Sequence, residues 1–289
     1  MATDVQPATS VAEVRVARRS LRHDLRAVKI VLHRELLRFY YDRTRMISQL
    51  FQPVLYLLVL GTGLGSLVAD GGNVDLKTFI FPGVIAMSVM FTGMFSAASI
   101  VWDREFGFLR EMLVAPVSRT AIVVGKVLGG AVVATFQGLV ILALAGLAGV
   151  PYDPVMLATL VLLMFAGAFT ITAFGVVLAA RIKKMQSFFG IMQMAMMPML
   201  FLSGALFPLS GLPGWLSVLT RLNPLTYAVD PLRHEVFAHI DANPALMRRF
   251  NPGVTWFGWH VPPALEVALV LLLGLVLLGG AIAQFRRTD

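Results

Sequence analysis

The sequence predicts an all-α membrane protein with six membrane-spanning helices. Of its 289 residues, 57% are hydrophobic and only 14% are charged, whereas about a quarter of the residues of soluble domains are charged. Six apolar runs reach or exceed the ~20 residues that a helix needs to cross the hydrocarbon layer. Each run is continuous, which favours helices over the alternating strands of a membrane barrel. The expected spans are about 47–68, 78–101, 121–150, 155–180, 186–208 and 264–285.

The segment before the first span predicts two further elements. Residues 1–20 are polar and carry no apolar pattern, which is typical of a disordered tail. Residues 21–45 place apolar side chains at helical spacing and basic side chains mostly on other faces, so we expect an amphipathic helix lying at the membrane interface. This helix would serve either as a lipid-binding anchor or as a docking surface for a partner. Residues 46–289 would form the six-helix domain. The apolar positions of the helix are Leu21, Leu25, Val28, Leu32, Leu36, Phe39 and Tyr40.

The distribution of basic residues predicts the orientation. Ten lysines and arginines lie between Arg15 and Arg45, three lie at 181–184, and Arg286 and Arg287 follow the last span. The connections 69–77 and 151–154 hold only Lys77 as a base. The positive-inside rule therefore places both termini and the loops 102–120 and 181–185 in the cytoplasm, and the connection 209–263 outside.

No motif for catalysis or for binding a cofactor is present. The sequence holds no cysteine, which excludes thiol chemistry and thiolate metal sites. His234, Glu235 and His239 resemble the zinc motif H-E-x-x-H, but positions five apart diverge by roughly 140° around a helix. Gly125 and Lys126 lack the first glycine and the hydroxyl residue of a phosphate-binding loop. We therefore expect no catalytic residue, no metal site and no cofactor in this chain.

The charge pattern bears on partners and on energy coupling. The net charge of +8 is concentrated before the first span, which favours contact with membrane lipid over nucleic acid. The spans hold few ionisable residues, with Lys126 near one end of a span and Glu266 near the end of another. Ion-coupled carriers usually need intramembrane acids or histidines. If the protein transports against a gradient, its energy should therefore come from a partner.

Two spans carry candidates for a substrate path. The second span has a hydroxyl stripe at helical spacing, and the fifth span combines aromatic residues with flexible methionines, which suit varied apolar cargo. The alternative is that both sets pack against neighbouring helices or lipid, and the sequence leaves both interpretations open. The candidates are Ser88, Thr92, Phe95, Ser96 and Ser99 on the second span, and Phe189, Met192, Gln193, Met196 and Met197 on the fifth.

The stretch VWDREFGFLREMLVAPVSRT, residues 101–120, interrupts two apolar runs with charges. Trp102, Phe106, Leu109 and Leu113 recur at helical spacing and Pro116 ends the pattern, so we expect a short amphipathic helix in a cytosolic loop. This helix either lies on the membrane surface or enters a cleft on a cytosolic subunit. Its mixed charge favours the second interpretation.

Two segments resemble a known family. REFGFLREMLVAPVSRTAIVVGK, residues 104–126, is similar to the signature region of ABC-2 type transporter permeases. LNPLTYAVDPLRHEVF, residues 222–237, resembles the segment before the last helix in drug-efflux members of that family. The resemblance covers residues from about 25 to 285 and includes the order, spacing and orientation of the spans.

The resemblance implies an exporter of two six-helix permeases and two cytosolic ATPase subunits, which bind ATP and Mg, in the cytoplasmic (inner) membrane of a prokaryote. A homodimer of permeases is favoured over a heterodimer. The family has a connecting helix, which would fall at about 25–45, and short external re-entrant helices, which would fall in 209–237. Its coupling helix would comprise Asp103, Arg104, Glu105, Phe106, Gly107, Phe108, Leu109, Arg110, Glu111, Met112 and Leu113.

The expected function is export of an amphipathic drug or lipid-like substrate, driven by ATP hydrolysis in the separate cytosolic subunits. The cargo class follows from the expected path, which is apolar with hydroxyl groups. One alternative within the family is export of a lipid-linked glycan. An alternative of a different class is an ATP-independent channel or secondary carrier.

Overall fold

A computed structural model describes residues 21–63, 76–107, 117–209, 212–240, 253–256 and 259–287. The expected tail at 1–20 and the part of the expected coupling helix at 108–113 lie outside the described residues.

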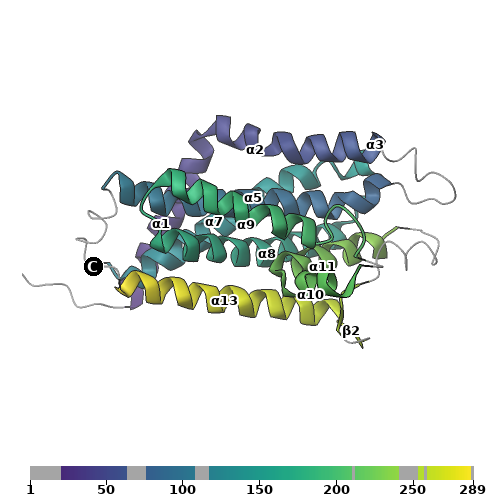
Figure 1. The fold of residues 1–289 in the computed structure, drawn as a ribbon. Helices are drawn as coiled ribbons and strands as arrows, with labels where there is room; N and C mark the ends of the chain where they lie inside the picture. The colour runs from purple at the N-terminus through teal and green to yellow at the C-terminus, as the bar shows by residue number, and fades with distance from the viewer. Residues whose placement is uncertain are drawn as a thin grey trace, which may run out of the picture.

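Six long apolar helices confirm the predicted all-α membrane fold. They lie side by side along one common direction (Figure 1). One end of the bundle carries α1 (Leu21–Tyr41) and the end of the last helix, and we call it the α1 end; the opposite end, with α11 (Pro224–Ala238), is the α11 end. The six spans are Arg43–Gly63, Leu76–Glu105 (α5), Arg119–Leu142 (α7), Pro154–Arg181 (α8), Met185–Leu202 (α9) and Pro263–Arg287 (α13).

Shorter elements complete the chain. Within the first span, a π-helical turn connects two α-helices. Asn223 separates α10 from α11, so two short helices form within the region 209–237 where the family resemblance implies short helices. Pro231, however, lies inside α11 without ending it. The remaining elements are α2 (Arg43–Leu55), η1 (Tyr56–Leu60), α3 (Gly61–Gly63), η2 (Ala145–Ala148), α10 (Gly214–Leu222), and the antiparallel pair β1 (Thr255–Trp256) and β2 (Trp259–His260).

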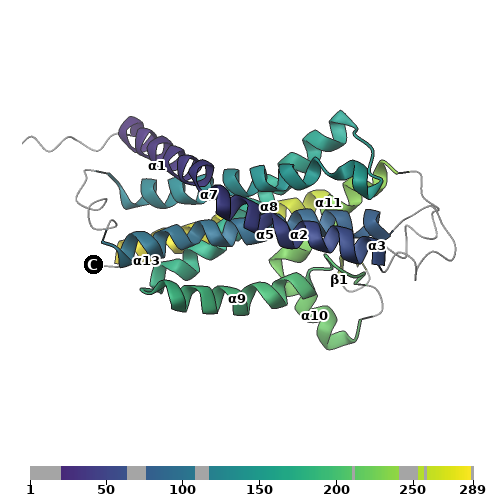
Figure 2. The ribbon, with the colours of Figure 1, turned by 90° about the horizontal axis from the view of Figure 1, so that it is seen from above.

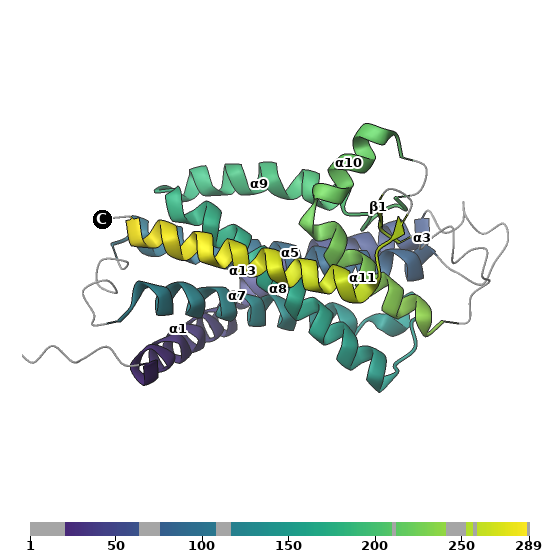
Figure 3. The same cartoon turned by 90° about the horizontal axis from the view of Figure 1, so that it is seen from below.

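The α5 helix is the centre of the bundle. Of its apolar window, 94% is buried within the chain, compared with 17% for the first span, 28% for α9 and 22% for α13. α9 forms one flank of the bundle and α1 lies on the opposite flank (Figures 2 and 3). The first span, α9 and α13 therefore present most of their apolar surface outward, to lipid or to another subunit.

The α7 helix ends at Leu142 instead of continuing to about residue 150 as expected. The Tyr152 hydroxyl donates a hydrogen bond to the Ala143 carbonyl at 2.9 Å and accepts one from the Gly146 amide at 3.0 Å. Gly149 follows with φ of 70°, a conformation that glycine adopts without steric cost. A short 3-10 helix, Ala145–Ala148, and the turn at Gly149 therefore take the place of the expected last turns of α7.

The α9 helix ends at Leu202, about six residues before the expected boundary. The chain turns at Gly204, which has φ of 74°. The Gly204 carbonyl accepts a hydrogen bond from the buried guanidinium of Arg233 in α11, and this guanidinium lies 4.3 Å from the ring centroid of Phe79 in α5. A cation held by a carbonyl and an aromatic face thus fixes α11 against α5 and the end of α9.

The α1 helix packs closely on α7 because two glycines leave room for it. A Cβ atom on Gly125 would lie 2.8 Å from Cβ of Val31, and one on Gly129 would lie 3.0 Å from Cβ of Glu35. Both distances are shorter than ordinary van der Waals contact. The close approach brings the side chain of Glu35 into the bundle, where it is buried.

Replacing Gly129 with valine is expected to destabilise the protein by about 1–3 kcal/mol, because the new side chain collides with Glu35 and pushes α1 away. The measurement is the thermal unfolding midpoint of the purified full chain in mild detergent. Gly279→Val is the control, since nothing lies within 4 Å of a Cβ atom at that helical glycine. An equal fall of the midpoint in both variants would contradict the packing argument.

Candidate functional site

Three consecutive charged residues end α5 at the α1 end of the bundle. Asp103, Arg104 and Glu105 form the last turn of the same helix that crosses the bundle, and no break separates them from it. Successive residues of a helix point about 100° apart, so the three side chains leave α5 in three directions. Asp103 binds α1 and α7, Arg104 binds the end of α8, and Glu105 binds the start of α9.

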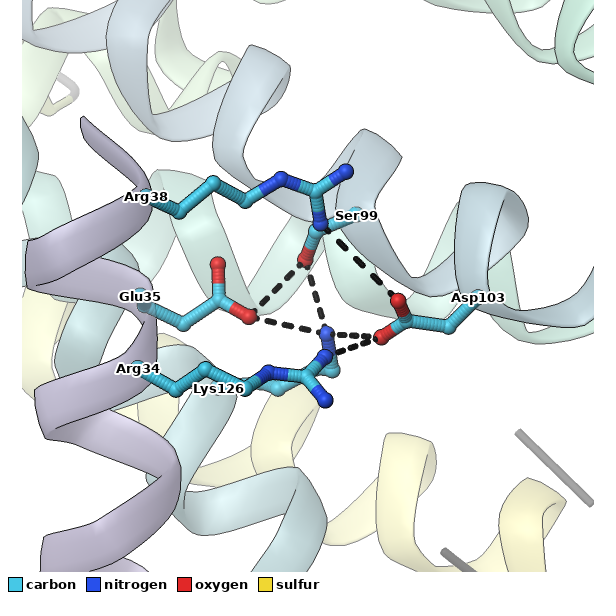
Figure 4. A network of polar contacts seen from close by, with 6 residues as sticks. All are labelled: Arg34, Glu35, Arg38, Ser99, Asp103 and Lys126. Atoms are coloured by element: carbon cyan, nitrogen blue, oxygen red, sulfur yellow. Dashed lines mark hydrogen bonds and ion pairs between the residues drawn. The ribbon is translucent and has the colours of Figure 1, made fainter. Parts of the chain in front are cut away.

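Lys126 of α7 is the centre of a buried ion network (Figure 4). Its Nζ lies 2.9 Å from Oε1 of Glu35 in α1 and 2.7 Å from Oδ2 of Asp103. It also donates a hydrogen bond of 2.9 Å to Oγ of Ser99 in α5. The three ionised side chains are only 3–5% exposed. One buried cation thus joins the carboxylates of two other helices.

Two arginines of α1 extend the network towards solvent. Nη2 of Arg34 lies 2.7 Å from Oδ2 of Asp103, and Nη1 of Arg38 lies 3.9 Å from Oδ1 of the same carboxylate. The Arg38 guanidinium also lies 5.8 Å from the ring centroid of Trp102. Asp103 therefore faces three cations from two helices, and the Arg38 contact is the longest of them.

The pairing explains why these charges are tolerated in an apolar bundle. Taking an ion out of water costs several kcal/mol unless a partner and further hydrogen bonds compensate for it. Each buried ion here has an opposite charge within 2.9 Å. Within the described ranges, no three His, Asp or Glu side chains are grouped so as to hold a metal ion. The arrangement suits the transmission of force between helices, because displacing one of them would leave a buried charge unpaired.

Arg104 fastens the end of α8. The last carbonyl groups of a helix have no partner within the helix and carry partial negative charge, so a guanidinium is a favourable donor to them. The acceptors of the Arg104 guanidinium are the carbonyl oxygens of Ala179 at 3.0 Å, Ala180 at 3.0 Å and Ile182 at 2.6 Å.

Glu105 and Arg119 also bind the backbone at the ends of two other helices, α9 and α13. Oε2 of Glu105 accepts a hydrogen bond of 2.8 Å from the amide of Met185, the first residue of α9. The guanidinium of Arg119, at the start of α7, donates to the carbonyls of Phe285 and Arg286 in the last turn of α13 at 3.1 and 3.2 Å. Side chains thus tie the ends of α1, α5, α7, α8, α9 and α13 together at the α1 end.

The remaining coupling candidates lie at the edge of the described structure. Phe106 is exposed and its ring stacks on Trp102, with centroids 5.0 Å apart. Gly107 has φ of 85° and turns the chain out of the helix. The candidates at 108–113 lie outside the described residues.

The hydroxyl stripe of α5 faces the interior of the chain. Ser99 belongs to the ion network, and the Thr92 hydroxyl donates to Oε1 of Gln49 in α2 at 3.3 Å. Ser96 packs against Gly130 of α7, where a Cβ atom would lie 3.0 Å from that of the serine. Contacts within one subunit thus account for three members of the stripe. The buried members are Ser88, Thr92, Ser96 and Ser99.

The candidates of the fifth span divide between two faces of α9. Met192 and Met196 are buried against the bundle. Gln193 and Met197 are exposed on the outer side, and Phe189 is exposed at the edge of α9 that faces α5. The ring of Phe189 lies 5.8 Å from that of Phe95, so these two candidates meet between α9 and α5.

Sequence reasoning missed the partners of the charged residues at the end of α5. Glu35 was one acid in a basic helix, and Lys126 was noted only as a charge near the end of a span. An ionisable residue inside an apolar run is a signal of function, and Glu35, one of the two acids on the basic helix α1, is a natural counter-ion for it. Together these two signals would have pointed to the pair.

Comparison with known proteins agrees with this architecture. Residues 26–237 match the family described as ABC-2 type transporter, and the chain belongs to this family. It is 30% identical over 192 residues to ycf38 of Cyanophora paradoxa, named as a transport permease, covering 65% of this chain and 66% of that protein. It is 32% identical over 161 residues to YbhR of Escherichia coli (strain K12), named as a probable multidrug ABC transporter permease, covering 55% of this chain and 43% of that protein.

A third relative aligns over a longer stretch. Nodulation protein J of Rhizobium leguminosarum bv. viciae is 29% identical over 203 residues, which cover 70% of this chain and 78% of that protein. The chain thus matches just under two thirds of the length of ycf38 and less than half of the length of YbhR. With six apolar helices, it is a multi-pass membrane protein of a transport permease family.

Lys126→Met is expected to destabilise the protein by about 3–5 kcal/mol, because it leaves the buried carboxylate of Glu35 without its cation and removes one of the three cations around Asp103. The measurement is the thermal midpoint of the detergent-purified chain, and Lys183→Met, an exposed lysine at the same end, is the control. Adding Glu35→Gln to Lys126→Met should restore part of the loss, since one unpaired charge disappears. If the thermal midpoint falls no further in Lys126→Met than in the Lys183→Met control, the Lys126 ammonium does not have the central role assigned to it.

Arg104→Gln is expected to loosen the connection between α8 and α9, because the carbonyls of Ala179, Ala180 and Ile182 at the end of α8 lose their hydrogen bonds to the guanidinium. Hydrogen–deuterium exchange of residues 182–190 should become faster, and trypsin should cleave sooner after Arg181, Lys183 or Lys184. Arg22→Gln on the exposed start of α1 is the control. Unchanged exchange in this segment would show that Arg104 does not hold it.

Proposed function

We propose that this chain is the transmembrane permease subunit of an ATP-binding cassette exporter and performs no chemistry itself. The supporting observation is the last turn of α5, where three consecutive side chains bind α1, α7, α8 and α9. The segment that follows this turn belongs to the stretch that resembles the signature region of the family. A partner that moves this segment would therefore move the ends of four other helices with it.

In this proposal, two cytosolic ATPase subunits bind ATP and Mg and contact each permease at residues 103–113. The charges within 108–113, Arg110 and Glu111, would face the ATPase, because Asp103, Arg104 and Glu105 are engaged inside the chain. The α1 helix would act as the connecting helix, since the ion network couples it to α5 and α7. Closure of the ATPase subunits would then tilt the α1 ends of the helices as one unit.

The orientation in this proposal has the α1 end in the cytoplasm of a prokaryote, with the chain in the inner membrane. The basic residues of α1, the basic connection at 181–184 and Arg286 all lie at this end. This distribution agrees with the positive-inside rule. The short helices α10 and α11 would then lie on the external side as re-entrant helices.

A pair of permeases, favoured as two identical copies, would complete the passage. Exposed large apolar side chains on two flanking helices support such a partner. They include Phe51, Leu55 and Leu58 of the first span, and Phe189, Met194 and Phe201 of α9.

The cargo in this proposal is an amphipathic drug or a lipid-like molecule. The name of YbhR, a probable multidrug ABC transporter permease, supports this choice. Export of a lipid-linked glycan is the alternative within the family. An ATP-independent channel or secondary carrier is the alternative outside it, and the absence of any ATPase partner would favour it.

Co-expression with a candidate P-loop ATPase is expected to yield a stable complex that hydrolyses ATP in mild detergent. Charge reversal in the variant Arg110→Glu/Glu111→Arg should weaken the complex or abolish stimulated hydrolysis, because the contact face changes sign. The charge-retaining variant Arg110→Lys/Glu111→Asp is the control and should keep the complex. A permease that inserts normally but binds no ATPase from its own genome would overturn the proposal.

A further inference from the structure

A cavity of about 350 Å³ lies beside the ion network, between the junction of α1 and α2, the last three turns of α5 and the start of α9. This volume is within the range of about 300–1,000 Å³ typical of small-molecule sites. The expected substrate path includes three of its lining residues, Phe95, Ser99 and Phe189. The sequence predicts an apolar path with hydroxyl groups, whereas the wall of the cavity also carries the charged side chains of Arg38, Asp42 and Arg45.

The polar side carries two guanidinium groups held over aromatic rings. The Arg38 guanidinium lies 5.8 Å from the ring centroid of Trp102, and that of Arg45 lies 5.9 Å from that of Phe95. Arginines stacked in this way are pre-oriented, because the ring fixes the plane of the guanidinium. All four side chains line the cavity.

Two hydrogen-bond donors in this wall have no acceptor. Nε of Arg45 and Nε2 of Gln49 are buried and make no hydrogen bond to any described part of the chain. Buried donors are almost always paired, and leaving one unpaired costs free energy. Both side chains line the cavity, so a rotation of either side chain would offer its unpaired donor to the acceptor oxygens of a ligand.

The local charge balance also indicates an anion. The cations Arg34, Arg38, Arg45 and Lys126 face the carboxylates of Glu35, Asp42 and Asp103, which leaves one positive charge in excess. Asp103 and Glu35 are already shared with Lys126. Oδ1 of Asp42 accepts the backbone amide of Arg45 at the start of α2. The existing carboxylates are therefore committed, and Arg38 has only a contact of 3.9 Å to its nearest one.

Apolar side chains form the rest of the cavity wall. They are Phe95, on whose ring Arg45 lies, Ala98 of α5, and Met185 and Phe189 of α9. Phe189 is 39% exposed on the flank of the bundle, where an apolar chain could continue outward along α9. A ligand that fits both sides has a charged head and an apolar tail.

We propose that this cavity binds the acidic head of an amphipathic anion, with a phosphate or carboxylate between Arg38 and Arg45 and the apolar portion against Phe95 and Phe189. The binding step needs no partner protein. That such anions are cargo rests on the proposed export function; the same head group could also belong to an anionic membrane lipid.

The test compares two probes that differ only in the head group, dihexanoyl phosphatidic acid and dihexanoyl phosphatidylcholine. Binding of each to the purified full chain in maltoside detergent is measured by native mass spectrometry. The phosphatidic acid is expected to bind about tenfold more tightly, as charge-assisted hydrogen bonds predict. Arg45→Gln should remove most of this preference, and the cap of α2 should survive because it uses the backbone amide of residue 45.

Arg43→Gln is the matched control, since Arg43 is exposed, lies two positions from Arg45 and does not line the cavity. It should leave both affinities within about twofold, a change of under half a kcal/mol. Ala98→Phe, which fills the cavity and keeps its charges, should weaken the binding of both probes. Equal affinity of the original protein for the two probes would overturn the proposal. So would an equal loss of the preference for phosphatidic acid in Arg43→Gln and Arg45→Gln.

The source of the anion is decided in nanodiscs of phosphatidylcholine with and without phosphatidylglycerol. If phosphatidylglycerol displaces the phosphatidic acid probe, the ligand of the cavity is a membrane lipid. If the probe remains bound, the ligand is a distinct amphiphile. Both results support the site. A chain that prefers the acidic probe but binds no ATPase would overturn the export function alone. A working complex with the ATPase that shows no head-group preference would overturn this site alone.

Discussion

A lysine ammonium buried among apolar helices must keep its carboxylates, and this requirement organises the α1 end of the molecule. Lys126 is held by one carboxylate from α1 and one from α5, so moving either helix away from α7 breaks an ion pair that is buried in a low-dielectric environment. Gly125 and Gly129 serve the same requirement, because any side chain there would keep Glu35 from reaching the ammonium. The position of α1 against the bundle thus depends jointly on charge and on the absence of two side chains.

The two ends of the bundle are held by interactions of different strength. At the α11 end most of the side-chain contacts are neutral hydrogen bonds, such as those from Asn223 to the Met199 carbonyl at 2.7 Å and from Trp256 to the Tyr227 hydroxyl at 2.9 Å. Neutral hydrogen bonds contribute about 0.5–1.5 kcal/mol each, whereas those to charged groups contribute about twice as much. Force applied at the α1 end would therefore move its helices together.

The sequence predicted what depends on local composition and missed what depends on distant contacts. Six spans follow from run length alone, because any apolar helix of ~20 residues suffices. The ends of α7 and α9 do not, since they are set by the Tyr152 hydroxyl and by Arg233 reaching back to Gly204. The charged stretch at 103–105 was recognised as unusual, but its partner Lys126 lies 23 residues further on, and Glu35 lies 91 residues before that lysine. The cavity is lined by side chains from four helices, and no local sequence pattern predicts that these side chains come together.

The ion network and the cavity share two residues, which links their states. Arg38 faces both Asp103 and the cavity, and Ser99 donates to Glu35, accepts from Lys126 and lines the same cavity. An anion that draws Arg38 into the cavity would weaken its contact with Asp103, and any movement of α1 that strengthens this contact would weaken binding of the anion. Such coupling is reciprocal, because the affinity change that one event imposes on the other must be equal in both directions. In the proposed exporter, the anion would bind at the contact between α1 and α5 that a cytosolic partner would move, so occupancy of the cavity and the position of α1 would be coupled directly.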